Sequence, residues 1–233
     1  MPFCIALIAL GAVALVFYLL EKCRRYSVRG VLMKGTVSLL FIAVAATAAS
    51  QNPNHVMNGW VIVGLALGLL GDIWLDLKFV YPKDEKLYTY SGFFVFGVGH
   101  ILYVVGMMSE FYADGNWLFF LIPLGGSLLF ACANHLLSKP MGLNFGKMKF
   151  IVFGYAFLLA MTTATALLCC IHTGWGKPAA IMMLAGGISF AVSDLVLSGT
   201  YFGEGKERPI DFILNYLTYY GAQFTIAFSL LFL

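Results

Sequence analysis

Eight long apolar runs constrain this chain more than any other feature, because each is close to the length of a membrane-spanning helix. Such a helix needs about 20 mostly apolar residues. The runs cover residues 2–20, 31–50, 59–78, 92–109, 116–137, 149–171, 178–199 and 212–232. Charged residues make up only 11% of the chain, against about 25% in a soluble domain. We therefore predict an all-α integral membrane protein, a single domain of residues 1–233 with eight transmembrane helices.

The remaining composition excludes several other classes of protein. The net charge of +3 belongs to the loops, and no basic patch with interleaved aromatic residues points to a nucleic acid. The sequence contains no P-loop, dinucleotide fingerprint or serine nucleophile motif, so we expect no bound cofactor. The five cysteines lack metal-ligand spacing and are interpreted as packing residues. The first run follows no basic segment and is interpreted as a retained helix rather than a signal peptide.

The distribution of lysine and arginine predicts how the helices are oriented. Twelve of the fourteen lie in or beside the first, third, fifth and seventh loops, whereas the even-numbered loops hold only Lys177. Cytoplasmic loops carry the excess of basic residues in membrane proteins. We therefore expect the odd-numbered loops in the cytoplasm and both termini outside it, in a bacterial cytoplasmic membrane or an endoplasmic reticulum membrane.

Two acidic residues, Asp72 and Asp194, lie deepest inside the predicted membrane. Asp72 belongs to the stretch Gly71–Asp76 and Asp194 to the stretch Ser193–Ser198, each near the end of an apolar run. Asp72 precedes Lys78 by six residues, or about 9 Å of helix. A carboxylate at this depth is costly unless it faces a protein interior or a wet cavity. The other strongly polar residues fall in the same half or near the midplane, so we predict one polar cavity that opens toward the cytoplasm.

Each polar group also has a simpler structural interpretation. Asp72 and Asp194 could pair with Lys34 or a hydroxyl group and only hold helices together. Asp76 lies closer to the interface and is interpreted as a solvated or cap-like acid. Lys34 could extend to the headgroups, neutralise a carboxylate in the cavity or bind a phosphate. Two aspartates and His100 could in principle bind zinc, but no second histidine lies near membrane depth, so we predict no metal site.

The two halves of the chain show a weak internal similarity. In each half an acidic residue lies near the end of an apolar run, a charged loop follows, and the next run carries a polar residue midway. The spacing from Asp72 to His100 is one residue shorter than the spacing from Asp194 to Gln223. A parallel repeat of four plus four helices would place Asp72 and Asp194 opposite each other.

Four motifs carry a resemblance to a known family. They are LLGDIWL (69–75), FGVGHILY (96–103), GGISFAVSDLVL (186–197) and NYLTYYGAQ (215–223). With this order and spacing, the chain resembles the YhhN family of membrane proteins, which includes the lysoplasmalogenases. The family usually has Lys-Pro in the second helix, where this chain has Lys34-Gly35, and its pattern does not require an acid at Asp76.

The resemblance implies an ether hydrolase that cleaves the vinyl ether bond of a lysoplasmalogen, giving a fatty aldehyde and a glycerophospho-ethanolamine or -choline. The catalytic pair would be Asp72 and Asp194, one as general acid and one stabilising the cationic intermediate. The residues expected to bind substrate are Lys34, His100, Tyr103, Ser193, Asn215, Tyr219, Tyr220 and Gln223. The expected partners are this lysophospholipid and the membrane lipids.

A transporter is the main alternative, because buried aspartates and a parallel repeat are equally typical of proton-coupled carriers of small molecules or lipids. A carrier needs access from both sides of the membrane. The outer half of the predicted helices lacks polar residues, which favours the enzyme. A lipid-binding protein without catalysis is a third interpretation.

Overall fold

The computed structural model describes residues 1–24, 26–203 and 208–233, and within these ranges it contains eight long helices and no strand. The helices are α1 (Pro2–Arg24), α2 (Val28–Gln51), α3 (Met57–Val80), α4 (Glu85–Phe111), α5 (Leu121–Leu137), α6 (Lys149–His172), α7 (Pro178–Phe202) and α8 (Pro209–Ser229). Each predicted apolar run corresponds to one helix, which confirms the all-α prediction.

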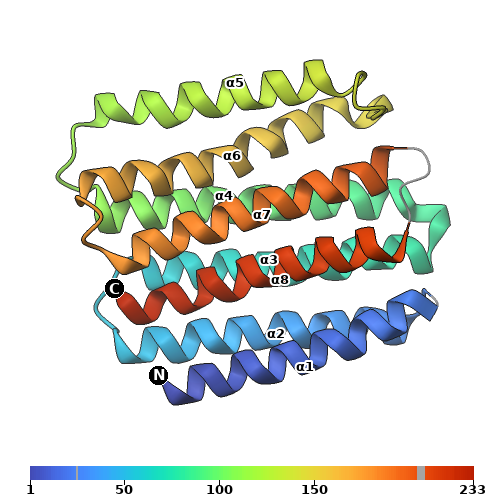
Figure 1. Cartoon of the computed structure of the whole chain (residues 1–233), viewed down its shortest axis with the longest axis horizontal. Coiled ribbons are helices and arrows are strands. Elements are labelled where there is room, and N and C mark those ends of the chain that lie inside the picture. Colours follow the sequence, from blue (N-terminus) through green and yellow to red (C-terminus); the bar gives the residue numbers. More distant parts are fainter. Residues whose placement is uncertain (25, 204–207) are drawn as a thin grey trace.

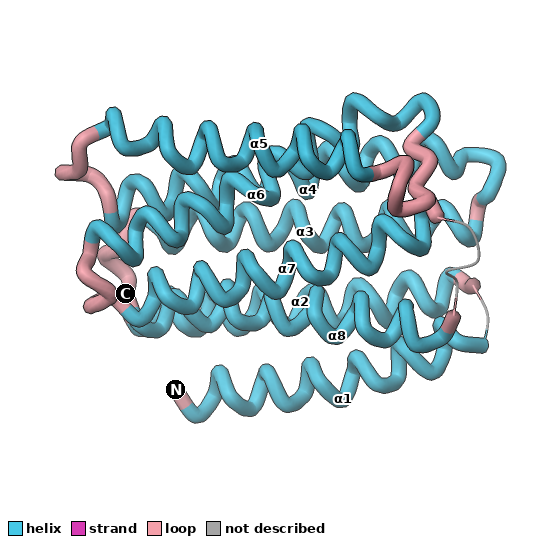
Figure 2. Tube along the Cα trace, turned by 45° about the horizontal axis from the view of Figure 1, so that its top comes forward, coloured by secondary structure: helices cyan, strands magenta, loops and turns pink. Residues whose placement is uncertain are grey.

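The eight helices run side by side, and the chain reverses direction from each helix to the next (Figure 1). Both termini lie at the same end of the bundle, so the odd-numbered loops gather at the opposite end. Helix α1 lies at one edge of the bundle and α5 at the other, as Figure 2 also shows. The orientation of this bundle relative to the cytoplasm and the internal repeat stay predictions.

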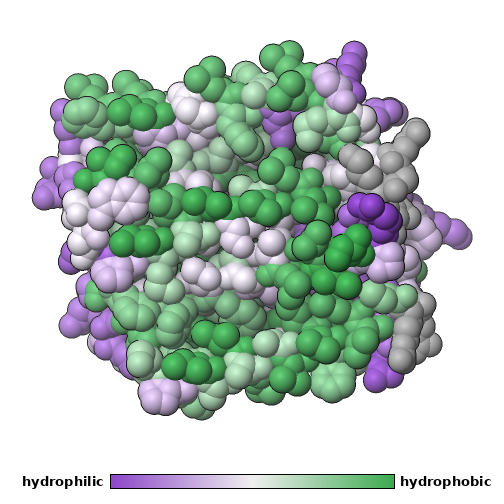
Figure 3. All heavy atoms as spheres, viewed as in Figure 1, coloured by the Kyte–Doolittle hydropathy of each residue, from purple (hydrophilic) through white to green (hydrophobic). Residues whose placement is uncertain are grey.

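The surface has the distribution of side chains that a bilayer requires. Apolar side chains cover the middle of the face shown in Figure 3, and hydrophilic side chains gather at its two ends. Large apolar residues such as Phe94, Leu129 and Phe150 point outward, which suits contact with lipid rather than water. Helices α1 to α7 are each long and apolar enough to cross a membrane. The chain is therefore a multi-pass membrane protein.

Helix α8 differs from the other seven, because its composition is too polar for it to qualify as a membrane span. Its polar residues Asn215, Tyr219, Tyr220 and Gln223 are nevertheless buried, and the helix packs against α7, α2 and α3. Hydropathy thus supports seven of the eight predicted spans. The eighth helix falls short because it carries polar side chains into the interior of the bundle rather than toward lipid.

Glycines allow α3 and α4 to pack closely. A Cβ atom on Gly99 of α4 would lie 3.2 Å from the carbonyl oxygen of Gly64 on α3. A Cβ atom on Gly71 would lie 2.5 Å from the ring of Phe96. Only glycine fits these positions without movement of the neighbour, so the contact fixes the adjacent Asp72 relative to α4.

Candidate functional site

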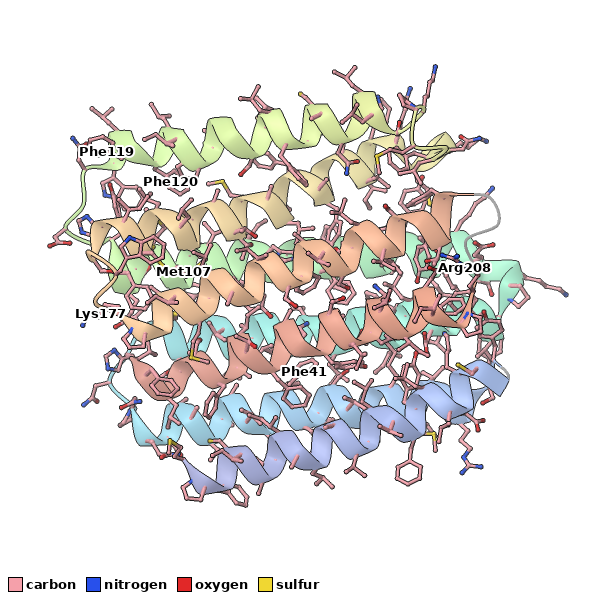
Figure 4. The ribbon with its side chains drawn as sticks, viewed as in Figure 1. Phe41, Met107, Phe119, Phe120, Lys177 and Arg208 are labelled. Atoms are coloured by element: carbon pink, nitrogen blue, oxygen red, sulfur yellow. The ribbon has the colours of Figure 1, made fainter. Side chains whose placement is uncertain are left out.

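The buried charged residues gather in the half of the bundle nearer the odd-numbered loops. Lys177 marks the end that holds the termini, and Arg208 marks the opposite end (Figure 4). Asp72 and Asp194 lie about two-thirds of the way along α3 and α7, and Lys34 lies in the first third of α2. The structure therefore places these charges in one half of the bundle, as the sequence predicts.

Asp72 on α3 is the centre of a buried cluster formed with α2 and α8. Lys34 of α2 places its Nζ atom 3.2 Å from Oδ1 of Asp72. Ser38 donates a hydrogen bond to Oδ2 at 2.6 Å, and Tyr219 of α8 donates to the same atom at 2.8 Å. Asp72 is only 1% exposed, so these contacts take the place of water. Its charge is both paired and hydrogen-bonded, which a buried carboxylate requires.

Asp76 lies one turn further along α3 and belongs to the same cluster. Nζ of Lys22 is 2.8 Å and Nζ of Lys34 is 3.6 Å from its Oδ1 atom, and Tyr18 donates to its Oδ2 atom at 2.8 Å. The prediction of a solvated Asp76 is wrong, because side chains from α1 reach this residue and bury it. Lys34 does not extend to the headgroups either, since it bridges Asp72 and Asp76.

Asp194 on α7 has very different surroundings. Tyr155 of α6 donates a short hydrogen bond to its Oδ2 atom. Within the part of the chain that the structure describes, no basic side chain lies within 4.0 Å of its carboxyl group. The residue is only partly buried. Asp194 is therefore held by one hydroxyl group, whereas Asp72 is held by a cation and two hydroxyl groups.

Both carboxyl groups lie on the wall of one cavity between α3, α7 and their neighbours. Its volume is about 30 Å³, which is enough for at least one water molecule. The polar residues on its wall are Lys34, Asp72, Tyr155, Ser193, Asp194, Tyr201, Asn215, Tyr216 and Tyr219. Six of the ten predicted site residues therefore share this wall. The described contacts include no hydrogen bond between the two carboxyl groups.

Three of the other predicted site residues lie behind the wall and support Asp72 indirectly. Tyr103 donates to Oε1 of Gln223 at 3.4 Å, and Nε2 of Gln223 donates to the hydroxyl of Tyr219 at 3.0 Å. Tyr219 in turn donates to Asp72. The hydroxyl of Tyr220 donates to the backbone carbonyl of Lys34 at 3.3 Å. This chain of hydrogen bonds crosses α4, α8 and α3 and fixes the orientation of the carboxylate.

His100, the remaining predicted site residue, lies outside the cavity wall. It is 2% exposed and packs edge-on against the rings of Tyr155 and Phe190. Its Nδ1 atom is 3.0 Å from the hydroxyl of Thr162, and Nε2 has no hydrogen-bond partner among the described residues. His100 therefore supports the ring of Tyr155 by packing.

Ser193 and Asn215 join α7 to α8 beside the cavity. The Ser193 hydroxyl donates to the backbone carbonyl of Asn215 at 3.2 Å, and Nδ2 of Asn215 donates to the backbone carbonyl of Ser193 at 2.9 Å. These reciprocal bonds satisfy groups that would otherwise be buried without partners. They hold the turn of α7 that carries Asp194 against α8.

Sequence reasoning missed several residues that the structure places at the site, namely Tyr18, Lys22, Ser38, Tyr155 and Tyr201. One of them carried a usable signal. Tyr155 follows Lys149, at the start of its predicted span, by six residues. Asp72 precedes Lys78, at the end of its predicted span, by the same number of residues. That spacing places Tyr155 at the depth of the acids.

A largely apolar cavity and a neighbouring apolar groove lie between Asp194 and the surface of the bundle. A cavity of about 50 Å³ shares Asp194, Tyr155 and Tyr201 with the polar cavity and extends toward α5. A groove of about 460 Å³ between α5, α6 and α7 meets this cavity at Phe130 and Ala191. Apolar side chains line the groove almost throughout. The groove therefore adjoins the cavity that contains Asp194.

Among the described residues, no group of three or more His, Cys, Asp and Glu side chains is placed to hold a metal ion. The model of the YhhN family matches residues 30–230, which include α3 to α7 and both cavity acids. A comparison with curated proteins and a comparison with solved structures each found no match.

Proposed function

Because the chain belongs to the YhhN family, we propose that it hydrolyses the vinyl ether bond of a lysoplasmalogen, with Asp72 and Asp194 as the reacting pair. The observation that supports this most directly is the position of both carboxyl groups on the wall of one cavity. The products are a fatty aldehyde and a glycerophospho-ethanolamine or -choline. The reaction consumes one water molecule, for which the cavity has room.

Asp194 is the proposed general acid. General acid catalysis needs a carboxyl group that can carry a proton, and a position without a neighbouring cation suits that role. Tyr155 donates to Oδ2 of Asp194, so the transferable proton belongs on Oδ1. Asp72 cannot take this role as easily, because Lys34, Ser38 and Tyr219 all stabilise its ionised form.

The chemistry begins with transfer of the Oδ1 proton of Asp194 to the β-carbon of the vinyl ether. The carbon–carbon π bond breaks and an oxocarbenium ion forms. The fixed carboxylate of Asp72, which is only 1% exposed, stabilises this cation, since preorganised charge acts strongly where it is shielded from bulk water. Water then adds to the α-carbon and returns a proton to Asp194, which leaves a hemiacetal.

Collapse of the hemiacetal uses the same acid. Asp194 protonates the ether oxygen and accepts the proton of the new hydroxyl group, so the carbon–oxygen bond breaks and the aldehyde is released. The glycerol moiety leaves with a free hydroxyl group. Asp194 ends the cycle protonated, as it began. Proton transfers of this kind are worth on the order of 10²–10⁴-fold in rate.

The hydrocarbon chain of the substrate would occupy the groove between α5, α6 and α7. The groove runs from Ala191 toward Leu184, away from the odd-numbered loops and toward the middle of the bundle. A lipid lying there keeps its tail at membrane depth and its headgroup near the loops. This is the orientation that a lysophospholipid already has in a bilayer.

The test is aldehyde release from a lysoplasmalogen by purified protein in detergent. We expect Asp194→Asn and Asp72→Asn each to lower turnover by about 10²-fold or more. The matched control is Asp84→Asn, which makes the same substitution at an exposed position between α3 and α4. An Asp194→Asn protein that folds and keeps near-wild-type turnover would overturn the proposal.

A proton-coupled carrier is the second candidate, and the buried cluster of Lys22, Lys34, Asp72 and Asp76 favours it. The two candidates differ in a direct measurement. A carrier reconstituted in liposomes moves a lipid or solute in response to a pH gradient and releases no aldehyde. The hydrolase releases aldehyde in detergent, where no gradient exists.

A further inference from the structure

Lys78, in the last turn of α3, is a buried lysine that the proposed chemistry does not use. It is 6% exposed, and its Nζ atom lies 3.1 Å from the centroid of the Tyr201 ring. No carboxylate of a described residue lies within 4.0 Å of this ammonium group. The exposed Glu85 acts on it only from beyond that distance. Among the described residues, Lys78 therefore has aromatic neighbours and no carboxylate in contact.

Lys78 differs in its partners from the other two buried lysines of this region. Lys22 pairs with Asp76, and Lys34 pairs with Asp72 and Asp76. The third buried acid, Glu21 on α1, has hydrogen-bonded partners of its own. Lys78 is thus the buried lysine whose ammonium group has no carboxylate of a described residue within 4.0 Å. Burial of an ammonium group without an anion is unfavourable, so an anionic ligand at this point would be stabilised.

The distance of Lys78 from the acids also matches the distance of the phosphate from the vinyl ether in the proposed substrate. The Tyr201 ring beneath its ammonium group lines both cavities that contain Asp194. Six residues of α3, or about 9 Å, separate Asp72 from Lys78 in the direction of the odd-numbered loops. About seven bonds join the β-carbon of a lysoplasmalogen to its phosphorus, a span of roughly 9 Å when three extended bonds cover about 3.8 Å.

We propose, on the basis of the proposed function, that Lys78 binds the phosphodiester of the lysophospholipid headgroup. The ammonium group donates to a phosphate oxygen, and the single negative charge of the phosphodiester balances the unpaired lysine. The glycerol moiety then spans the distance to the cavity, where its vinyl ether meets Asp194 and Asp72. Lys34, which the sequence suggested as a phosphate ligand, is already neutralised by the two aspartates.

The test measures binding without catalysis. The ligand is a 1-alkyl lysophosphatidylcholine, which has no vinyl ether to cleave, and the reference ligand is the 1-alkylglycerol with the same chain and no phosphate. In a maltoside detergent we expect Lys78→Met to raise Kd for the lysophospholipid by about 10-fold or more. Binding of the alkylglycerol should not change. Lys78→Arg keeps the charge and should retain most of the affinity.

Several outcomes would overturn this assignment. Unchanged lysophospholipid affinity in Lys78→Met, or an equal loss for both ligands, would contradict it. Inorganic phosphate that binds with the same Lys78 dependence and affinity as the lipid would make this a site for free phosphate instead. Lys83→Met, an exposed lysine beyond the end of α3, is the matched control and should bind both ligands normally.

Two further readouts separate this proposal from its alternatives. A structural lysine would lower the melting temperature of the ligand-free protein when replaced, whereas removal of an unpaired charge should leave it unchanged or higher. Because the ligand is inert, the binding result stands even if wild-type protein releases no aldehyde. Failure of the hydrolase proposal and failure of the Lys78 proposal are therefore distinguishable.

Discussion

At the scale of single residues, the two cavity acids differ in how firmly they are held. Asp72 is 1% exposed and receives contacts from Lys34, Ser38 and Tyr219. Asp194 is partly buried and receives one hydrogen bond, from Tyr155. A carboxylate fixed by three partners suits electrostatic stabilisation, which requires no reorganisation. A carboxyl group held at one oxygen leaves the other free to exchange a proton with substrate.

Tyr155→Phe tests whether this single hydrogen bond positions Asp194. We expect kcat to fall by about 10-fold, because the loss of a hydrogen bond worth about 1 kcal/mol lets the carboxyl group rotate away from the cavity. The change in stability should be of the same small size. The measurements are aldehyde release at saturating substrate and thermal unfolding in detergent.

The matched control for this variant is Tyr90→Phe. Tyr90 donates to the backbone carbonyl of Lys147 at 3.1 Å and lines neither cavity that contains Asp194, so its loss should leave kcat unchanged. Equal kcat values for Tyr155→Phe and wild type would show that Tyr155 does not position the acid.

The residues predicted from the sequence were those that stand out against an apolar background. Asp72, Asp194 and Lys34 are rare charges at membrane depth, so the free-energy cost of placing a charge there was enough to identify them. The burial of Asp76 could not be predicted in the same way. It depends on Lys22 and Tyr18 from α1, and no local pattern says which face of α1 turns toward α3. Partner choice between distant helices is a property of packing.

At the scale of helices, α3 and α4 pack closely against each other directly beside the site. Glycine at position 71 brings Phe96 against α3, and the Phe96 ring packs edge-on against Phe190 and Tyr219. Tyr219 donates to Asp72. Displacement of Phe96 would therefore move a hydrogen-bond donor of Asp72, so packing between helices and site geometry are coupled here.

Gly71→Ala tests this coupling. The new methyl group would lie 2.5 Å from the Phe96 ring, and overpacking of this kind costs about 1–3 kcal/mol. We expect a lower melting temperature together with lower turnover, although alanine is the better helix former. Gly59→Ala, near the start of the same helix, meets no atom within 4 Å and should be neutral or stabilising. A Gly71→Ala protein as stable and active as Gly59→Ala would contradict the coupling.

Helix α8 shows what hydropathy can and cannot predict about an element. The sequence placed a span at residues 212–232, and the structure has a helix at Pro209–Ser229. The hydropathy of this helix nevertheless falls short of what a candidate membrane span requires. An average over residues does not distinguish polar groups that face lipid from those that face the interior, and Asn215 and Gln223 face the interior. The spacing of the polar residues carried this information.

At the scale of the whole molecule, a lysine, a pair of acids and an apolar groove follow one another along the length of the bundle. Lys78 stands near the odd-numbered loops, the acids lie about two turns deeper along α3 and α7, and the apolar groove continues from Ala191 toward the middle of the bundle. A lysophospholipid presents a phosphate, a reactive bond and a hydrocarbon chain in the same order. Helix α5 at the edge of the bundle forms one wall of the groove.

Ala191→Phe tests this arrangement, because Ala191 lies where the groove meets the cavity that leads to Asp194. A phenylalanine there should block a long hydrocarbon chain and leave the acids in place. We expect KM for a long-chain lysoplasmalogen to rise by about 10-fold, since loss of each buried methylene costs about 0.8 kcal/mol. A substrate whose chain ends before the groove should be hydrolysed with nearly unchanged KM. The control is Ala9→Phe on the exposed face of α1, which should alter neither value. Equal effects on the long and short substrates would place the tail elsewhere, because a blocked groove can discriminate only against a chain long enough to enter it.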